Sequence, residues 1–375
     1  MYHPEVIDRN LNKLEKLTKQ KFHRYSIDES IARQEHLGRL MDEDGKLIRE
    51  PNQEEEEFIL NEMQICRYDF RYWANRYAFL NSKDSKLQRI KFWESQEIAL
   101  QHIADGELEG WKMNKDNLWI WLKARQLGAT AICEASIGHR LFFRNNQRAV
   151  IASDDPDHSV ELSRRVELIF KMLPWWMKPH REFNVKGTEM FFNLSNCSLV
   201  IGHGRKEGGG IGQGQTTNIF HFTEIPDWLN TDQIDEDFLP TVPILPTSVG
   251  FMESTARGRY NWWHKAFQRA WDKKSRFNAL FIPWYTERET YALTPPIDWE
   301  PAKITLEHAK NVKNQSPLYC LGKTVNLTKE QLYWWEKNYT EYKEAGDLWK
   351  FHQEYAADHM EAFQSSTMSL FNSEL

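Results

Sequence analysis

Residues 119–130 read Trp-Ile-Trp-Leu-Lys-Ala-Arg-Gln-Leu-Gly-Ala-Thr, an apolar run that enters a glycine-containing turn. The usual phosphate-binding loop, G-x-x-x-x-G-K-[ST], cradles phosphates with backbone N–H groups, its Lys contacts the β- and γ-phosphate oxygens, and its Ser or Thr holds Mg²⁺. Gly128 and Thr130 occupy the positions of the second glycine and the hydroxyl residue, whereas Lys123 stands at the first glycine and Ala129 at the lysine. Since lysine acts on phosphate as a flexible point charge, we expect Lys123 to supply that charge from the start of the loop.

Length, composition and cysteine usage describe an ordinary globular protein. The chain has 375 residues, of which 41% are apolar and 27% charged, enough for one large domain or two smaller ones. Its net charge of −6 means that any nucleic-acid contact is local or shared among subunits. The four cysteines lie far apart without a CxxC pair, which argues against a zinc site and a disulfide framework. We find no signal-peptide pattern and no run approaching the ~18 apolar residues of a membrane helix, so we expect a reducing cytoplasm and no membrane contact.

Short apolar runs alternate with helical patterns after residue 117, which is typical of an α/β protein with a mainly parallel sheet. We expect strands at 118–122, 149–153, 218–222, 249–252 and 279–282, and a hairpin of 190–192 with 198–201. Helices are expected at 58–79, 130–143, 156–173, 260–271, 329–344 and 347–359, with a further apolar helix that follows 92–96 and reaches 103, and irregular structure is expected at 285–325. We divide the chain into a polar N-terminal extension (1–57), a nucleotide-binding core (58–325) and a helical C-terminal segment (326–375).

Two further strands end in residues suited to phosphate chemistry. The mostly apolar run 217–224 ends at Glu224, and ligands of such sheets bind beyond the carboxyl ends of the strands. Thr223 stands where a Walker B strand carries its Asp, and its hydroxyl can hold a metal-bound water; the alternative is a surface Glu after a core strand. Ser254 and Thr255 end the next strand, where hydroxyls can sense loss of a γ-phosphate or simply cap a helix.

The order of these motifs carries a family resemblance. K-A-R-Q-x-G-x-T (123–130), G-x-G-x-G-x-T (within 208–216), h-h-h-[ST]-E (ending at 224) and E-S-T-A-x-G (253–258) resemble the large terminase subunit of tailed bacteriophages, as do residues 281–285 and 351–363. The resemblance implies an ASCE-type P-loop ATPase, a mainly parallel central sheet flanked by helices, with a helical N-terminal extension and a C-terminal helical lid or linker. It also implies a ring, usually a pentamer, that drives double-stranded DNA into the capsid through the portal protein.

Site roles follow from the resemblance position by position. Lys123 matches a displaced Walker A lysine, Arg125 the loop arginine, Thr130 the Mg²⁺ ligand and Glu224 the catalytic base of ATP hydrolysis. Thr223 would act on the metal through water, and Glu253, Ser254 and Thr255 would form the coupling motif, which converts hydrolysis into motion. The rest of the expected nucleotide site comprises Gln96, Ala124, Gln126, Leu127, Gly128, Ala129, Ser254 and Thr255. Gln96, after Phe92-Trp93, resembles the glutamine that reads adenine, although a plain surface glutamine is an equal alternative.

Two departures from the family pattern matter. Gln213 stands where an arginine commonly reaches the ATP of a neighbouring subunit, a contact worth several powers of ten in rate. Arg205 is our first candidate substitute, followed by Arg257 and Arg259. The family also continues into an RNase H-like nuclease domain, whereas this chain stops at residue 375, so we expect no DNA cleavage by it.

The expected partners are duplex DNA, the portal protein and the small terminase subunit, met in the host cytoplasm and transiently at the procapsid portal. DNA would be held through its backbone by scattered basic residues, with candidates Lys178, Arg181, Lys186 and the Lys273–Lys274 pair. Two alternatives stay open: a helicase-like ATPase, and a degenerate, non-catalytic nucleotide-binding scaffold, because Ala129 and Thr223 replace residues normally tied to ATP and Mg²⁺.

Overall fold

The computed structural model describes residues 4–81, 86–102, 117–178, 184–186, 189–191, 197–204, 211, 215–245 and 247–364. Its centre is a sheet in the order β10-β3-β9-β8-β4-β7-β6-β5. The strands from β10 to β7 are parallel, and β6 and β5 add an antiparallel edge. Their bounds are β3 (Asn117–Lys123), β4 (Arg148–Ser153), β5 (Asn184–Lys186), β6 (Glu189–Phe191), β7 (Ser198–His203), β8 (Ile219–Thr223), β9 (Val249–Ser254) and β10 (Asn278–Ile282). The expected strands and the hairpin are confirmed.

Strand β3 is buried along its whole length, because helices cover both faces of a parallel sheet. Strand β9 separates it from β8, which is the strand arrangement of the ASCE type. Helices α7 (Ala129–Phe143) and α8 (Pro156–Met172) pack together over β4, β7 and β8. Helix α9 (Trp262–Trp271) connects β9 to β10 in the opposite direction, so a right-handed crossover places it on the other face. The predicted fold class is confirmed.

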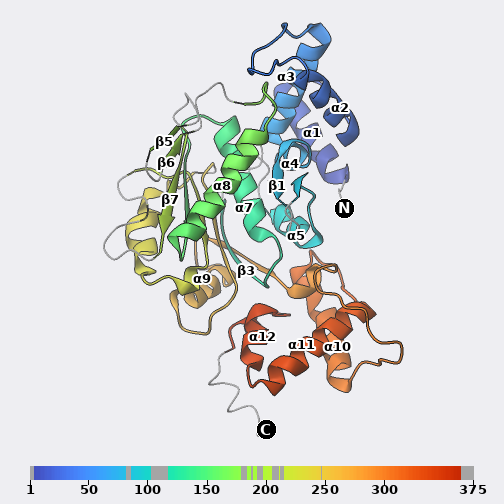
Figure 1. The fold of residues 1–375 in the computed structure, drawn as a ribbon. Coiled ribbons are helices and arrows are strands. Elements are labelled where there is room, and N and C mark those ends of the chain that lie inside the picture. The colour runs from blue at the N-terminus through green and yellow to red at the C-terminus, as the bar shows by residue number, and fades with distance from the viewer. Residues whose placement is uncertain are drawn as a thin grey trace.

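The N-terminal residues fold onto the core as helices (Figure 1, top). These are α1 (Pro4–Thr18), α2 (Ile27–Gly38), α3 (Gln53–Tyr68) and α4 (Phe70–Tyr77), followed by strands β1 (Phe79–Asn81) and β2 (Leu87–Arg89) and helix α5 (Glu94–His102). All eight residues of α4 are buried. The buried guanidinium of Arg76 donates to the Ser30 hydroxyl and the Tyr25 carbonyl, and the Trp175 indole donates to the Leu37 carbonyl.

The C-terminal helices lie at the opposite end of the molecule (Figure 1, bottom). They are α10 (Lys303–Tyr319), α11 (Lys329–Glu344), α12 (Leu348–Glu354) and α13 (His359–Ala362). The expectation of irregular structure over 285–325 is therefore wrong for 303–319. The sequence hides α10 because it begins at Ala302 without a side-chain cap and contains Pro317. The single helix expected at 347–359 is two short ones, because Asp358 caps a new start at α13.

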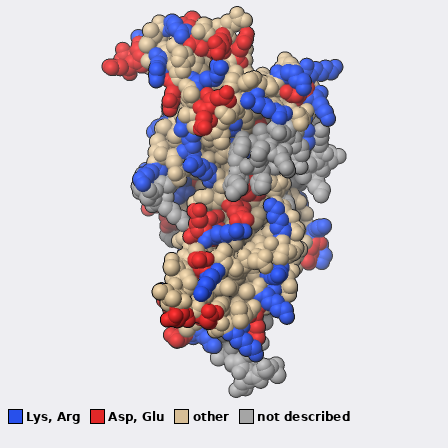
Figure 2. Space-filling view, turned by 90° about the vertical axis from the view of Figure 1, so that its right-hand side faces the viewer, with Lys and Arg blue, Asp and Glu red and all other residues tan. Residues whose placement is uncertain are grey.

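Four short turns of helix complete the described elements: η1 (Ile225–Asp227), η2 (Ile234–Phe238), η3 (Leu239–Thr241) and η4 (Trp284–Thr286). Acidic and basic side chains are interspersed over the face drawn in Figure 2, which fits the small net charge. No helix in the described part of the chain has the length and apolar character to cross a membrane.

Candidate nucleotide site

A cavity of about 320 Å³ opens where β3, β8 and β9 end. Its walls are formed by charged and polar side chains: Lys123, Arg125, Gln126, Asp154, His158, Glu224, Asp227, Thr255 and Arg257. The carboxyl ends of parallel strands are where ligands of such sheets bind. Five residues of the expected nucleotide site therefore meet in one place: Lys123, Arg125, Gln126, Glu224 and Thr255.

The loop between β3 and α7 has the backbone geometry of a tight turn. Gly128 adopts φ +68°, and a Cβ there would lie 2.4 Å from the Gln96 Nε2, so only glycine fits. Two side chains of α5 fix the loop: the Ser95 hydroxyl donates to the Leu127 carbonyl (3.1 Å), and Gln96 Nε2 donates to the Gly128 carbonyl (2.9 Å). Among the described residues, no side chain caps the start of α7. Its first N–H groups and the helix dipole thus make an anion site.

Gln96 is buried, so the alternative of a plain surface glutamine is wrong. Its carbonyl oxygen accepts from the Trp93 backbone N–H (2.9 Å) while its amide holds Gly128. A second hollow of about 140 Å³ lies beside Gln96, Trp93, Gly128 and Arg89, and it shares no lining residue with the charged cavity. Gln96 thus joins the loop to this hollow, and its role toward adenine stays a prediction.

Lys123 lies buried at the end of β3, with its Nζ 3.1 Å from Glu253 Oε2. Burial opposes its charge, but the Glu253 and Glu224 carboxylates outweigh that effect and raise the pKa of the ammonium. Register explains the meeting: Trp121 of β3 pairs with Glu253 of β9, so Lys123 and Glu253 project from the same face of the sheet.

Glu253 is the centre of the buried polar cluster. The Thr130 hydroxyl donates to its Oε1 (2.8 Å), and His221 Nε2 lies 3.4 Å from the same oxygen. Burial disfavours the carboxylate, yet Lys123 and the hydrogen bonds from His221 and Thr223 hold the pKa of Glu253 well below its usual range. The sequence placed Glu253 only in a coupling motif. The signal that could have identified it is a carboxylate inside an apolar strand, which requires a buried cationic partner.

Glu224 follows β8 directly and adopts a left-handed conformation, φ 52° and ψ 33°. This conformation costs a non-glycine residue about 1–2 kcal/mol, and such strain gathers at functional sites. The Ser254 hydroxyl donates to Glu224 Oε2 (3.2 Å). Burial raises the pKa of Glu224, with Lys123 acting against that shift. The strained turn places the Glu224 carboxylate in the cavity next to Lys123, and its raised pKa makes this carboxylate more basic.

Arg125 and Arg257 are held by one carboxylate from the C-terminal segment. Glu354 of α12 pairs with Arg125 Nε (2.7 Å) and Arg257 Nη1 (2.5 Å), and its carbonyl accepts from the Arg125 N–H (2.9 Å). Arg257 also pairs with Asp227 (3.3 Å). Arg257, one candidate for the arginine acting on a neighbouring subunit, thus lines the cavity of its own chain.

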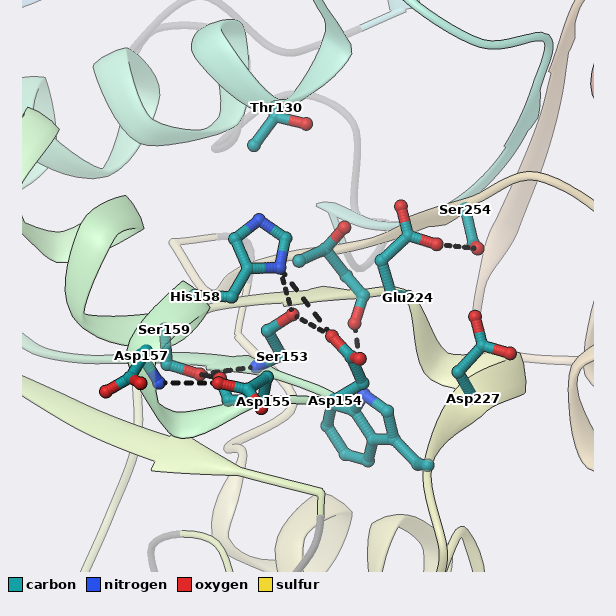
Figure 3. A network of polar contacts seen from close by, with 12 residues as sticks. Thr130, Ser153, Asp154, Asp155, Asp157, His158, Ser159, Glu224, Asp227 and Ser254 are labelled. Atoms are coloured by element: carbon teal, nitrogen blue, oxygen red, sulfur yellow. Dashed lines mark hydrogen bonds and ion pairs between the residues drawn. The ribbon is translucent and has the colours of Figure 1, made fainter.

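A group missed by the sequence reasoning lies where β4 ends. The Ser153 hydroxyl lies 2.8 Å from Asp154 Oδ1 and 2.8 Å from His158 Nδ1. Figure 3 shows these side chains together with Glu224 and Asp227. Asp154 and His158 line the cavity. The sequence predicted only that a helix begins at 156, and Asp155 caps that helix by accepting from the Asp157 N–H. Polar residues directly after a predicted strand were the available signal.

The other predicted residues are placed as follows. Thr255 lines the cavity, and its buried hydroxyl has no hydrogen-bond partner among the described residues, as expected of a group that awaits a ligand. Thr223 is buried beside Glu253. Arg259 donates to the Phe363 carbonyl, outside the residues that line the cavity. Arg205, like Gln213, lies outside the described residues.

The donor set fits Mg²⁺ accompanied by phosphate. Among the described residues no cluster of three or more His, Cys, Asp or Glu side chains forms an all-protein cage. Mg²⁺ is usually held by one or two protein oxygens, waters and substrate phosphates instead. The Thr130 hydroxyl and the Glu253 carboxylate, 2.8 Å apart, offer that minimal set at the end of the loop.

Comparison with known proteins supplies structural matches only. No protein-family model matches the sequence, and no curated protein matches it. The large terminase of bacteriophage HK97 matches the structure with a TM-score of 0.52 at 10% identity, over 77% of this chain and 54% of that one. The ATPase domain of the Thermus phage P74-26 large terminase gives 0.40 at 13% identity, over 65% of this chain and 88% of that domain.

The match to the HK97 protein bears on the fold. This chain spans about half the length of that terminase. At 10% identity, the shared feature is the arrangement of the strands and helices rather than the individual site residues. The described part of this chain therefore has the fold of a bacteriophage large terminase, the family that its ordered motifs resemble.

Proposed function

We propose that this chain is the ATP-hydrolysing part of a viral DNA-packaging motor, and that it drives double-stranded DNA into a procapsid. The observation that carries the proposal is that Lys123 and Glu224 line one cavity, while Lys123 also pairs with Glu253, which accepts from the Thr130 hydroxyl. A buried cation, a hydroxyl and a carboxylate of raised pKa beside a helix N-terminus suit the transfer of a phosphoryl group to water.

In this proposal the residues divide the chemistry among them. The first backbone N–H groups of α7 bind the β- and γ-phosphates, and Lys123 neutralises charge on the γ-phosphate oxygens. Glu224 orients the attacking water and accepts its proton. Arg125 adds positive charge from the cavity mouth. Mg²⁺, held through Thr130 and through water at Glu253 or Thr223, supplies Lewis-acid stabilisation of the phosphate charge.

The proposal extends to the assembly. A neighbouring subunit would contribute an arginine, with Arg205 as our first candidate, which makes hydrolysis depend on a homo-oligomeric ring. The portal protein and the small terminase subunit complete the proposed partners, and the host cytoplasm is the proposed location. Gln96 and the hollow beside Trp93 would receive adenine, and Thr255 with Ser254 would report loss of the γ-phosphate.

ATP hydrolysis measured against protein concentration tests the proposal, with wild type beside Glu224→Gln and with or without duplex DNA. We expect turnover that rises more steeply than linearly with protein, and a loss of about 10²-fold or more in the variant with nucleotide binding retained. Lys123→Ala should weaken both binding and turnover. Wild type without turnover that still binds ATP would favour a degenerate scaffold, and displacement of a strand from a duplex would favour a helicase.

A further inference from the structure

A basic groove runs along α9, away from the nucleotide cavity. It has a volume of about 630 Å³, and five cationic side chains line it with one acidic side chain, Asp235. The cations are Lys265, Arg269, Lys273, Lys274 and Arg276. We call this feature the α9 groove. The chain has a net charge of −6, so it can bind a polyanion only through a local concentration of positive charge. The α9 groove is such a concentration.

Three of these cations are exposed and available. Lys265, Arg269 and Lys273 are exposed, and no carboxylate within the described ranges lies at ion-pair distance from any of them. The nearby acids are engaged elsewhere: Asp272 pairs with Lys274 (3.3 Å), and Asp235 accepts from the Trp262 indole (2.8 Å).

Three exposed cations follow α9 and its C-terminal end. Lys265 and Arg269 are one turn apart on α9, about 6 Å along its axis, and Lys273 follows just beyond the helix end, where the chain turns through a left-handed conformation. Cations separated in this way can each meet a different phosphate of a DNA strand. Flexible ammonium and guanidinium groups in a row neutralise phosphates without reading base edges, as a contact independent of sequence requires.

The connections of α9 tie the groove to the nucleotide site. Helix α9 joins β9 to β10, and these two strands are the hydrogen-bonded neighbours of β3 on either side. Strand β3 leads into the phosphate loop, and β9 carries Glu253 and Ser254. A change in the hydrogen bonds around the γ-phosphate can therefore reach the groove through a single connection, the one from β9 to α9.

We propose that the α9 groove binds the phosphate backbone of duplex DNA through Lys265, Arg269 and Lys273, and this assignment rests on the proposed packaging function. It selects among the basic residues named from the sequence. The Lys273–Lys274 pair belongs to the groove. Lys178 is half-buried at the end of another segment, Arg181 lies outside the described residues, and the side chain of Lys186 is not described.

Duplex binding measured over a range of salt tests the assignment. The probe is a fluorescein-labelled DNA duplex of random sequence, followed by anisotropy from about 50 to 200 mM salt. The variant is Lys265→Gln/Arg269→Gln/Lys273→Gln. A matched control, Lys310→Gln/Lys313→Gln/Lys337→Gln, removes three exposed lysines from α10 and α11. Thermal unfolding of every variant establishes that it is folded.

We expect the groove variant to bind at least tenfold more weakly at the lowest salt, with the slope of log K against log salt reduced by about 2 to 3, because each phosphate contact contributes about 0.9. The control variant and Lys265→Arg/Lys273→Arg, which keeps the charge, should retain the wild-type slope. An unchanged slope in the groove variant, with wild type binding DNA and hydrolysing ATP, overturns the assignment and leaves the proposed function standing.

Three other results also decide the matter. If the groove variant binds DNA normally but loses the steep dependence of ATP hydrolysis on protein concentration, the groove holds a neighbouring subunit and the assignment is wrong. If wild type neither hydrolyses ATP nor binds the duplex, the assignment and the proposed function fail together. If wild type hydrolyses ATP without binding the duplex, the assignment alone is overturned.

Discussion

Glu253 is a site residue whose role becomes visible only in the folded structure. Lys123, Glu224 and Thr130 were predicted as site residues because each has a motif position, whereas Glu253 entered only as part of a coupling motif. Its contact with Lys123 depends on β9 lying beside β3, although the two residues are far apart in the chain. Sequence spacing does not contain that register. Asp154 and His158, in contrast, follow a predicted strand, and their position after it was a signal that the sequence offered.

The buried pair of Lys123 and Glu253 predicts a strong energetic coupling. Lys123→Met leaves the Glu253 carboxylate buried without its cation, and we expect a loss of about 3–5 kcal/mol in the free energy of unfolding. Adding Glu253→Gln should recover a large part of this loss, because no charge is then left without a partner. Urea denaturation of both single variants and the double variant measures the coupling. Additive effects would contradict the pairing.

The raised pKa of Glu224 predicts an acidic limb in the pH profile of ATP hydrolysis. A general base works when deprotonated, so activity is present above its pKa and is lost as the pH falls through it. The limb should therefore lie above the usual glutamate value. The Ser254 hydrogen bond lowers the pKa of Glu224, and Ser254→Ala should move the limb to still higher pH. A limb that does not move would show that another group titrates.

At the scale of the element, the pattern of apolar runs predicted the sheet and its flanking helices well. Strands β3, β4, β8, β9 and β10 lie within one or two residues of the expected positions, because each is a short buried run bounded by turn residues. Helix α10 was missed because its start lacks a capping side chain, and packing against α11 and β10 stabilises it instead. Tertiary contacts of this kind are not visible in local sequence.

Helix α7 carries a buried acid that predicts how stability depends on pH. Burial raises the pKa of Glu134 to about 8, although Arg165 lies 3.5 Å away. The folded state thus binds a proton that the unfolded chain releases above its ordinary value of 4.5. Stability from this group is present at low pH and is lost as the pH rises to about 8, at most about 1.4 kcal/mol for each pH unit.

Glu134→Gln removes that titration, so its free energy of unfolding should vary less between about pH 5 and about pH 8 and exceed that of wild type at the upper end. Denaturation in urea at several pH values measures this difference. Glu161→Gln is the matched control, since Glu161 pairs with the same Arg165 but is exposed. A control that flattens the profile equally would place the effect at Arg165 instead.

On the scale of the whole molecule, the composition predicted a globular protein with a large core and only local concentrations of charge, and the ordered motifs predicted the family whose fold the structure has. The way in which the two ends of the chain meet the core was not predictable. Glu354 lies more than two hundred residues after Arg125 in the sequence, yet it fixes both Arg125 and Arg257 at the cavity mouth. Long-range ion pairs of this kind have no local signature.

The ion pairs of Glu354 with Arg125 and Arg257 predict that these two arginines stabilise α12. Glu354→Ala removes the two ion pairs, each worth about 1 kcal/mol because the arginines are partly exposed. Backbone amides of 348–354 should then exchange about tenfold faster in hydrogen-exchange mass spectrometry. Lys350→Ala removes the exposed pair with Asp347 on the same helix and should leave exchange nearly unchanged. Equal acceleration in both variants would contradict a link through Glu354.

The burial of α4 between the N-terminal helices and the core sets a limit on how this protein can be shortened. Deleting residues 1–57 would remove the bonds of Arg76 to Ser30 and Tyr25. It would also expose to water the aromatic side chains of α4 that the N-terminal helices cover. The Trp175 indole would lose the Leu37 carbonyl as well. An expression plasmid that begins at the apparent start of the nucleotide-binding core should therefore yield aggregates, and a usable recombinant fragment has to keep α2.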